Sequence, residues 1–171
     1  MLKNLSFLNM FVWNLFIIGL WHLIVFVMCV KSPRATFDPK HERFAPKEWE
    51  NGGRWYRDKL KIQLWKDKVP QYVGKGEFSK EHLQDISLEY LDDFIMETCR
   101  GEWMHLRGAL CAVITLLINP LFVGLVFSIL IFLGNVPFAI IQRYNRFRLL
   151  VIRKKLLRDL RSGEMGRAVT A

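Results

Sequence analysis

The sequence predicts an all-α membrane protein with about three transmembrane helices. Two stretches of the 171-residue chain, residues 6–30 and 108–142, contain no Asp, Glu, Lys or Arg and are rich in Leu, Ile, Val, Phe and Trp. A helix rises about 1.5 Å per residue, so about 20 apolar residues cross a hydrocarbon core roughly 30 Å thick. An Asn-Pro step at Asn119 divides the second stretch, which makes room for one span before the division and one after it. We treat residues 1–171 as a single membrane domain.

The first uncharged stretch predicts a transmembrane helix over residues 5–30. It is longer than the apolar run of a secretory signal peptide, and it ends in Val-Met-Cys-Val-Lys-Ser-Pro-Arg rather than in the small residues of a cleavage site. We therefore expect this helix to be retained, with cleavage as the alternative.

The second uncharged stretch predicts a hairpin of two spans, residues 103–118 and 121–141. Proline lacks a backbone N–H and disfavours helical conformation at the preceding residue, so Asn119-Pro120 predicts a turn. One long kinked helix and a re-entrant hairpin are the alternatives.

The distribution of charge predicts how the chain is oriented. Residues 142–171 contain nine Lys and Arg residues against Asp159 and Glu164, and five more basic residues follow the first span closely. The positive-inside rule then places residues 31–102 and the tail, residues 142–171, in the cytoplasm of a multi-pass cell-membrane protein. Leu149, Ile152 and Leu156 recur at helical spacing in the tail, which indicates a helix that extends from the third span along the lipid surface. Because this charge adjoins a membrane helix, the expected partner is the anionic lipid bilayer rather than nucleic acid.

The segment over residues 31–102 is cytoplasmic or interfacial by this reading, and Pro and Gly break its first part into short elements. Pro46 favours a short helix just after it, and Gly52 can end that helix with a left-handed residue. Residues 55–67 alternate aromatic and basic side chains, which is typical of an anchor at the membrane surface. The functional alternative is a site for a lipid head group or a sugar, with Glu50 and Lys66 as polar contacts.

The apolar face predicted for a helix over residues 79–105 ends in a carboxylate and an imidazole. Ser79 is a favourable N-cap. Glu102 and His105 are neighbours on a helix, and Glu97 lies about 80° round from His105. A carboxylate that orients a histidine allows that histidine to remove a proton from a hydroxyl group. A histidine held by structural hydrogen bonds is the alternative, and no metal is expected because the chain has only one Glu-x-x-His motif.

Three motifs in chain order resemble a known family. They are Trp49-Glu-x-x-Gly with Trp65-Lys66 after it, Glu97-Thr-x-Arg-x-Glu-x-x-His105, and Asn135-Val-Pro-x-x-Ile-x-Gln-Arg-Tyr-Asn-Arg. Over about residues 40–160 the chain resembles the glycosyl-4,4'-diaponeurosporenoate acyltransferase family. The first helix matches only as a hydrophobic segment.

The resemblance implies a membrane-bound O-acyltransferase. Such an enzyme transfers a fatty acyl chain to a sugar hydroxyl of a glycosylated carotenoid or related glycolipid, with acyl-CoA or an acyl lipid as donor and no further cofactor. We expect His105, Glu102 and Glu97 to be catalytic. The expected substrate-binding residues are Arg100, Glu50, Trp65, Lys66, Asn135, Arg143, Tyr144, Asn145 and Arg146. A non-enzymatic membrane adaptor and a glycolipid-binding accessory protein are the alternatives, and neither requires His105.

Overall fold

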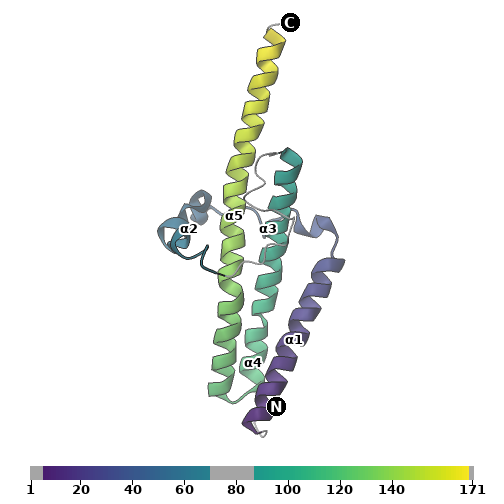
Figure 1. Ribbon diagram of the computed structural model, residues 1–171, viewed down its shortest axis with the longest axis vertical. Helices are drawn as coiled ribbons and strands as arrows, with labels where there is room; N and C mark the ends of the chain where they lie inside the picture. Colours follow the sequence, from purple (N-terminus) through teal and green to yellow (C-terminus); the bar gives the residue numbers. More distant parts are fainter. Residues whose placement is uncertain (1–5, 70–86, 170–171) are drawn as a thin grey trace. The chain divides into compact units, whose positions relative to one another are not determined.

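The computed structural model of the protein describes residues 6–69 and 87–169, with side chains as far as residue 162. Within these residues it contains helices and no strands (Figure 1). The elements are α1 (Phe7–Lys31), η2 (Arg34–Phe37), η3 (Glu48–Gly53), α2 (Arg54–Asp58), η4 (Ile62–Leu64), α3 (Leu88–Ala109), α4 (Cys111–Ile118) and α5 (Leu121–Val169).

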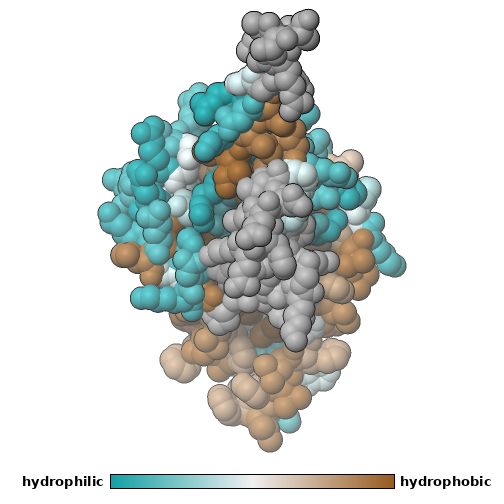
Figure 2. Space-filling view, turned by 45° about the horizontal axis from the view of Figure 1, so that its top comes forward, coloured by the Kyte–Doolittle hydropathy of each residue, from teal (hydrophilic) through white to brown (hydrophobic). Residues whose placement is uncertain are grey.

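Three helical stretches are long and apolar enough to cross a membrane: Phe7–Lys31, Leu88–Ile118 and Leu121–Ser162. Each stretch exposes several large apolar side chains, and Phe7–Lys31 exposes most of its own, as expected of helices whose solvent is lipid. Figure 2 shows hydrophobic residues gathered over the apolar helices and hydrophilic residues over the polar segments. The predicted fold class, an all-α membrane protein with three spans, is confirmed.

The chain divides into two compact units, and the divisions fall inside α3 and α5. Unit 1 comprises Met1–Thr36 and Arg100–Gln142, and unit 2 comprises Phe37–Cys99 and Arg143–Ala171.

Unit 1 consists of α1, the C-terminal part of α3, α4 and the first part of α5, which lie side by side (Figure 1). The predicted turn is confirmed, because α4 ends at Ile118, Asn119 is extended and α5 begins at Leu121. Asn14 of α1 donates from Nδ2 to Asn119 Oδ1 at 2.8 Å, and Asn119 Nδ2 donates to Asn14 Oδ1 at 2.7 Å. Because the hydrocarbon core offers no water, these paired amides satisfy each other and join α1 to the hairpin turn.

The predicted second span, residues 103–118, lies in a longer helical stretch. Helix α3 begins at Leu88 and continues through Trp103, where the sequence analysis placed the start of the span, and it breaks only between Ala109 and Cys111. The indole Nε1 of Trp21 donates to the Arg107 carbonyl at 2.9 Å, next to this break. The predicted N-cap, Ser79, lies outside the described residues.

Unit 2 combines the short helices η3, α2 and η4 with the N-terminal part of α3 and the second part of α5. Leu91 and Ile95 of α3 form an apolar core with Leu149 of α5. Helix η3 ends in left-handed residues that include Gly52 (φ 64°) and Gly53 (φ 88°), so the expected left-handed end at Gly52 is confirmed. Helix α5 continues without a break from the apolar stretch through the basic tail.

Candidate active site

Unit 1 brings together three polar side chains on three helices: His22 of α1, His105 of α3 and Asn135 of α5. Asn135 Nδ2 lies 3.4 Å from His22 Nε2, and the Asn135 side chain is also the hydrogen-bond partner of His105. Asn135 is buried, whereas both histidines are half-buried. We call these three residues the histidine cluster. Ionisable residues within membrane spans are rare and are commonly functional.

The hydrogen bonds of the histidine cluster fix which groups donate. His22 Nδ1 must donate to the Ile18 carbonyl, 2.8 Å away, because a carbonyl only accepts. In the neutral ring Nε2 is then an acceptor, and it takes one Asn135 Nδ2 hydrogen while the other goes to the Ile131 carbonyl at 2.9 Å. The remaining polar atom of Asn135 is Oδ1, which can accept a hydrogen bond from the His105 ring. The second ring nitrogen of a neutral His105 is then left as a proton acceptor.

Packing around the histidine cluster leaves little freedom for its members. A Cβ atom added at Gly108 would lie 2.5 Å from Asn135 Oδ1 and 3.1 Å from His22 Nε2, so only glycine leaves room for both side chains. The ring of His105 stacks on Phe138 with centroids 5.1 Å apart and an interplanar angle of 20°. These contacts restrict the position of Asn135 and the plane of the His105 ring.

Two further predicted site residues, Arg100 and Glu102, belong to unit 1 and precede His105 on α3. The Glu102 side chain is buried, with 8% of its surface exposed. The structure gives His105 an amide as hydrogen-bond partner, whereas the sequence predicts a carboxylate. The orienting role of Glu102 or Glu97 therefore stays a prediction.

Unit 2 contains a second polar group of residues, centred on a buried ion pair between Glu50 and Arg143. Arg143 donates from Nε to Glu50 Oε1 and from Nη2 to Glu50 Oε2, both at 2.7 Å. Its other hydrogen bonds, at 2.8–3.1 Å, go to the carbonyls of Arg43, Phe44 and Ala45. All five N–H groups of the guanidinium are therefore used within the protein.

Glu50 is completely buried and accepts two more hydrogen bonds, from the Tyr56 hydroxyl at 2.5 Å and from the Lys47 N–H at 2.6 Å. Burial pushes the pKa of Glu50 up, but the hydrogen bonds from Arg143, Tyr56 and Lys47 outweigh it and hold the pKa below its usual value. Burial and the adjacent Glu50 carboxylate raise the pKa of Tyr56 far above its usual value. We call Glu50, Tyr56 and Arg143 the arginine clamp.

The other predicted site residues also belong to unit 2. Arg146 donates from Nη1 to Cys99 Sγ at 3.1 Å, and its guanidinium lies 5.5 Å from the ring centroid of Phe44. The Tyr144 hydroxyl accepts from Gln63 at 3.3 Å, Lys66 pairs with Asp67 at 2.6 Å, and Trp65 donates to the Leu60 carbonyl at 2.9 Å. Glu97 and Asn145 are half-buried on α3 and α5. Their roles in binding substrate remain predictions.

The match to a known protein family covers every residue of the histidine cluster and of the arginine clamp except His22. The family described as glycosyl-4,4'-diaponeurosporenoate acyltransferase matches residues 40–155. The chain belongs to this family. The proteins of that name from Staphylococcus aureus strains MRSA252 and bovine RF122 / ET3-1 are each 31% identical over 137 residues, which is 78% of this chain and 80% of theirs. The protein of strain Newman is 30% identical over the same length. No solved structure matches the chain.

Membership in the glycosyl-4,4'-diaponeurosporenoate acyltransferase family makes the chain an acyltransferase. In residues 6–69 and 87–169, no group of three or more His, Cys, Asp or Glu side chains converges in the way that would hold a metal ion.

Sequence reasoning missed three residues of these clusters: His22, Gly108 and Tyr56. The signal for His22 was a single imidazole inside an otherwise apolar span, which is unusual enough to mark a functional residue. Gly108 and Tyr56 carry no comparable signal. Gly108 is important because it lies against Asn135, which is distant in the sequence. Tyr56 is important because the local fold brings its hydroxyl to Glu50.

Proposed function

We propose that this protein is a membrane-bound O-acyltransferase that esterifies a sugar hydroxyl of a glycosylated carotenoid or related glycolipid with a fatty acyl chain. The histidine cluster carries the proposal, because it holds a half-buried imidazole, with one ring nitrogen left as acceptor, among helices long enough to cross a membrane. The name of the relatives supplies the substrate class.

The proposed reaction uses His105 as general base. Its free ring nitrogen takes the proton of the sugar hydroxyl while the hydroxyl oxygen attacks the acyl carbonyl of the donor. An oxygen–carbon bond forms, the bond from the acyl carbon to the thiol or alcohol of the donor breaks, and His105 returns the proton to that leaving group. No covalent intermediate on the protein is needed.

Asn135 and His22 are positioning residues in this scheme. A proton gained by His105 places a positive charge on the ring, and the Asn135 oxygen that accepts from the ring stabilises that charge. His22 in turn accepts from Asn135 and keeps the amide oxygen turned toward His105. Glu102 or Glu97 adds a negative charge nearby, as the sequence predicts.

We assign the stabilisation of the negative charge on the acyl oxygen to Arg100. It lies about one and a half helical turns before His105 on α3. The other candidate was Arg143, but its five N–H groups already donate to Glu50 and to three backbone carbonyls. A cation near the oxyanion is typically the largest single contribution to catalysis of this kind.

We further propose that the polar segment after α1 and the basic tail face the cytoplasm of the cell membrane. The excess of Lys and Arg in the tail supports this orientation. A cysteine introduced at exposed Lys155 should then be labelled by an impermeant thiol reagent only after the cells are opened. Labelling in intact cells would show that the tail faces the outside of the cell, contrary to this proposal.

The test of the acyl transfer is the substitution His105→Ala. Membranes that contain the protein, a glycosylated carotenoid and an acyl donor are assayed by mass spectrometry for the mass of one added acyl chain. Loss of a general base lowers turnover by about 10²–10⁴-fold. His41→Ala, which removes an exposed histidine of the polar segment, serves as the matched control at equal expression. Undiminished turnover of His105→Ala would remove this residue from the mechanism, and the absence of any acylated product from the wild type would reject the function.

A further inference from the structure

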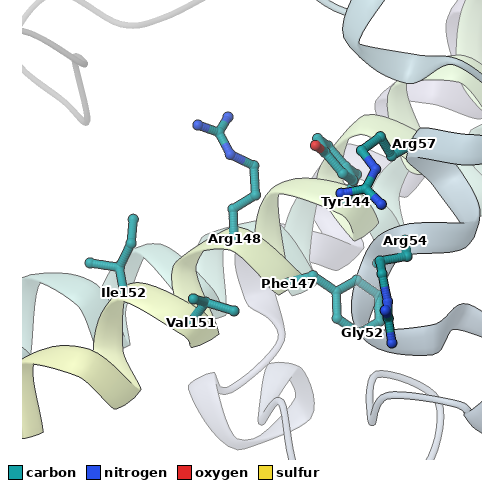
Figure 3. Close-up of a pocket in the computed structure, with 9 residues that line it drawn as sticks. Gly52, Arg54, Arg57, Tyr144, Phe147, Arg148, Val151 and Ile152 are labelled. Atoms are coloured by element: carbon teal, nitrogen blue, oxygen red, sulfur yellow. The ribbon is translucent and has the colours of Figure 1, made fainter. Parts of the chain in front are cut away.

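Unit 2 contains a pocket that neither the acyl-transfer chemistry nor the family name explains. Its volume is about 330 Å³, and it lies between one face of α5 and the junction at which η3 ends and α2 begins (Figure 3). Three arginines line it, Arg54 and Arg57 from α2 and Arg148 from α5. None of the lining residues among those that the structure describes is acidic, so this part of the lining carries a positive charge.

The guanidinium groups of the pocket keep hydrogen-bond donors to offer. Arg54 uses Nε and one Nη2 hydrogen on the oxygens of Asn51, at 3.4 and 2.7 Å. Arg57 donates from Nε and Nη2 to the carboxylate of Asp58, which is outside the lining, at 2.7 and 3.4 Å. A guanidinium has five N–H groups, so on each of these arginines three have no partner within residues 6–69 and 87–162. All three pocket arginines are exposed, in contrast to the buried Arg143.

The wall of the pocket is built by a backbone feature rather than by chance exposure of basic residues. Gly53 has φ 88°, and a Cβ atom there would lie 2.9 Å from Phe147 Cβ, so glycine allows the loop to approach α5 closely. Phe147 and Tyr144 supply an aromatic surface beneath the arginines. Cations from two segments, about ninety positions apart in the sequence, therefore line one pocket together with two aromatic side chains.

We propose that this pocket binds the phosphate group of the acyl donor. The inference rests on the proposed acyl transfer for the identity of the ligand as donor. Arginine binds phosphate oxygens through paired, charge-assisted hydrogen bonds, and three guanidinium groups match a group that carries one to two negative charges. An uncharged sugar acceptor would not need this concentration of cations. The phosphate can come from the nucleotide part of acyl-CoA or from the head group of an anionic phospholipid.

Binding is measured on the full-length protein in a maltoside detergent, which contains no phosphate. The probes are radiolabelled CoA and glycerophosphoglycerol, the water-soluble head group of phosphatidylglycerol, in equilibrium dialysis. The test variant is Arg57→Gln/Arg148→Gln. The charge-matched control is Lys154→Gln/Lys155→Gln, which removes two exposed cations of the same helix that do not line the pocket. Arg57→Lys/Arg148→Lys keeps the charge and reports whether the pocket tolerates substitution, and thermal unfolding checks that each variant is folded.

We expect the wild type to bind one of the probes, which identifies the source of the phosphate. The Gln variant should bind it about tenfold more weakly or worse, because two charge-assisted hydrogen-bonding groups are lost. The control should bind as the wild type, and the Lys variant should bind with intermediate strength. Equal binding by the wild type and the Gln variant, equal loss in the control, or no binding of either probe by the wild type would overturn the proposal.

Kinetics then separates this proposal from the proposed function. With the acylated form of the probe that binds, Arg57→Gln/Arg148→Gln should raise KM for the donor by about the same factor and leave KM for the glycolipid unchanged. If the variant transfers the acyl chain with an unchanged KM for the donor, the proposed phosphate site is rejected and the proposed acyltransferase function stands. If the wild type binds the probe through these arginines but transfers no acyl chain, the phosphate-binding pocket stands and the proposed acyltransferase function is rejected.

Discussion

The histidine cluster of unit 1 and the arginine clamp of unit 2 are both buried and polar, yet their hydrogen bonds are used differently. In the arginine clamp every guanidinium N–H of Arg143 and both carboxylate oxygens of Glu50 have protein partners. The hydrogen bonds of the histidine cluster run from the Ile18 carbonyl through His22 to Asn135, which interacts with His105, and one ring nitrogen of His105 has no partner among the residues that the structure describes.

This difference separates a structural role from a chemical one. A buried ion pair whose members are fully hydrogen-bonded holds segments in place, and it has no donor left for a substrate. A reacting group must keep one polar atom for the substrate, and His105 has such an atom. Arg143, which the sequence marks as a candidate substrate contact, thus has the hydrogen bonds of a residue that fastens residues 43–50 to α5.

The largest effect, on stability, should follow removal of the carboxylate of the arginine clamp. Glu50→Ala leaves the Arg143 guanidinium buried with no counter-charge, which costs about 3–5 kcal/mol. We expect the variant to melt far below the wild type in detergent or to accumulate poorly in membranes. Glu48→Ala, which removes an exposed glutamate of the same short helix, is the control and should melt as the wild type. Equal melting of Glu50→Ala and Glu48→Ala would mean that the clamp does not hold unit 2.

The histidine cluster should respond in turnover rather than in stability. Asn135→Leu removes the acceptor that fixes His105 and stabilises its charged form, so we expect kcat to fall by about 10–100-fold with little change in either KM. The matched control is Asn14→Leu, which breaks the amide pair with Asn119 in the same unit. That variant should lose about 1 kcal/mol of stability and keep its kcat. Equal kcat values for the two variants would deny Asn135 a positioning role.

The sequence predicted the parts of the fold that depend on local signals. Asn119-Pro120 ends a helix because proline has no N–H to donate and restricts its neighbour, and the structure turns at this step. Gly52 ends a short helix because it adopts positive φ without strain, and it does so here. The uncharged stretches predicted the spans because hydrocarbon excludes charge.

The contacts of the candidate site depend on partners too distant in sequence for local patterns to identify. Glu50 and Arg143 are 93 positions apart, and each had many possible partners of opposite charge. The face of α1 that carries His22 could not be chosen, because nearly all residues of that helix are apolar and no face is marked by polarity. The individual residues of the site were therefore predicted better than their pairing.

A smaller test of the same comparison uses two glycines. Gly108→Ala places a Cβ atom 2.5 Å from Asn135 Oδ1, so the amide must move, and we expect turnover to fall about tenfold, as for one lost hydrogen bond. Gly134→Ala on α5 meets nothing within 4 Å and should leave turnover unchanged. Alanine favours helix over glycine by about 1 kcal/mol, so a loss of turnover in Gly108→Ala cannot be ascribed to a weaker helix. Wild-type turnover in Gly108→Ala would show that the space at this residue is not needed for catalysis.

The smallest expected effect is a change in the pH dependence of stability. The pKa of Glu50 is lower in the folded protein than its ordinary value of 4.5, so the folded state favours the ionised carboxylate. The resulting stabilisation is complete above the ordinary pKa and is lost as the pH falls through the lowered one, with a slope of up to about 1.4 kcal/mol per pH unit.

Glu50→Gln removes this titration, because an amide does not ionise. We expect thermal unfolding in detergent to show a lower melting temperature than the wild type at pH 7 and a smaller further decrease on acidification below pH 4.5. The two curves should therefore converge at low pH, where the wild-type carboxyl is also uncharged. Glu48→Gln is the control and should keep the wild-type acid dependence. Parallel curves for the wild type and Glu50→Gln down to low pH would mean that the charge on Glu50 does not stabilise unit 2, and the contrast with the histidine cluster would then rest on geometry alone.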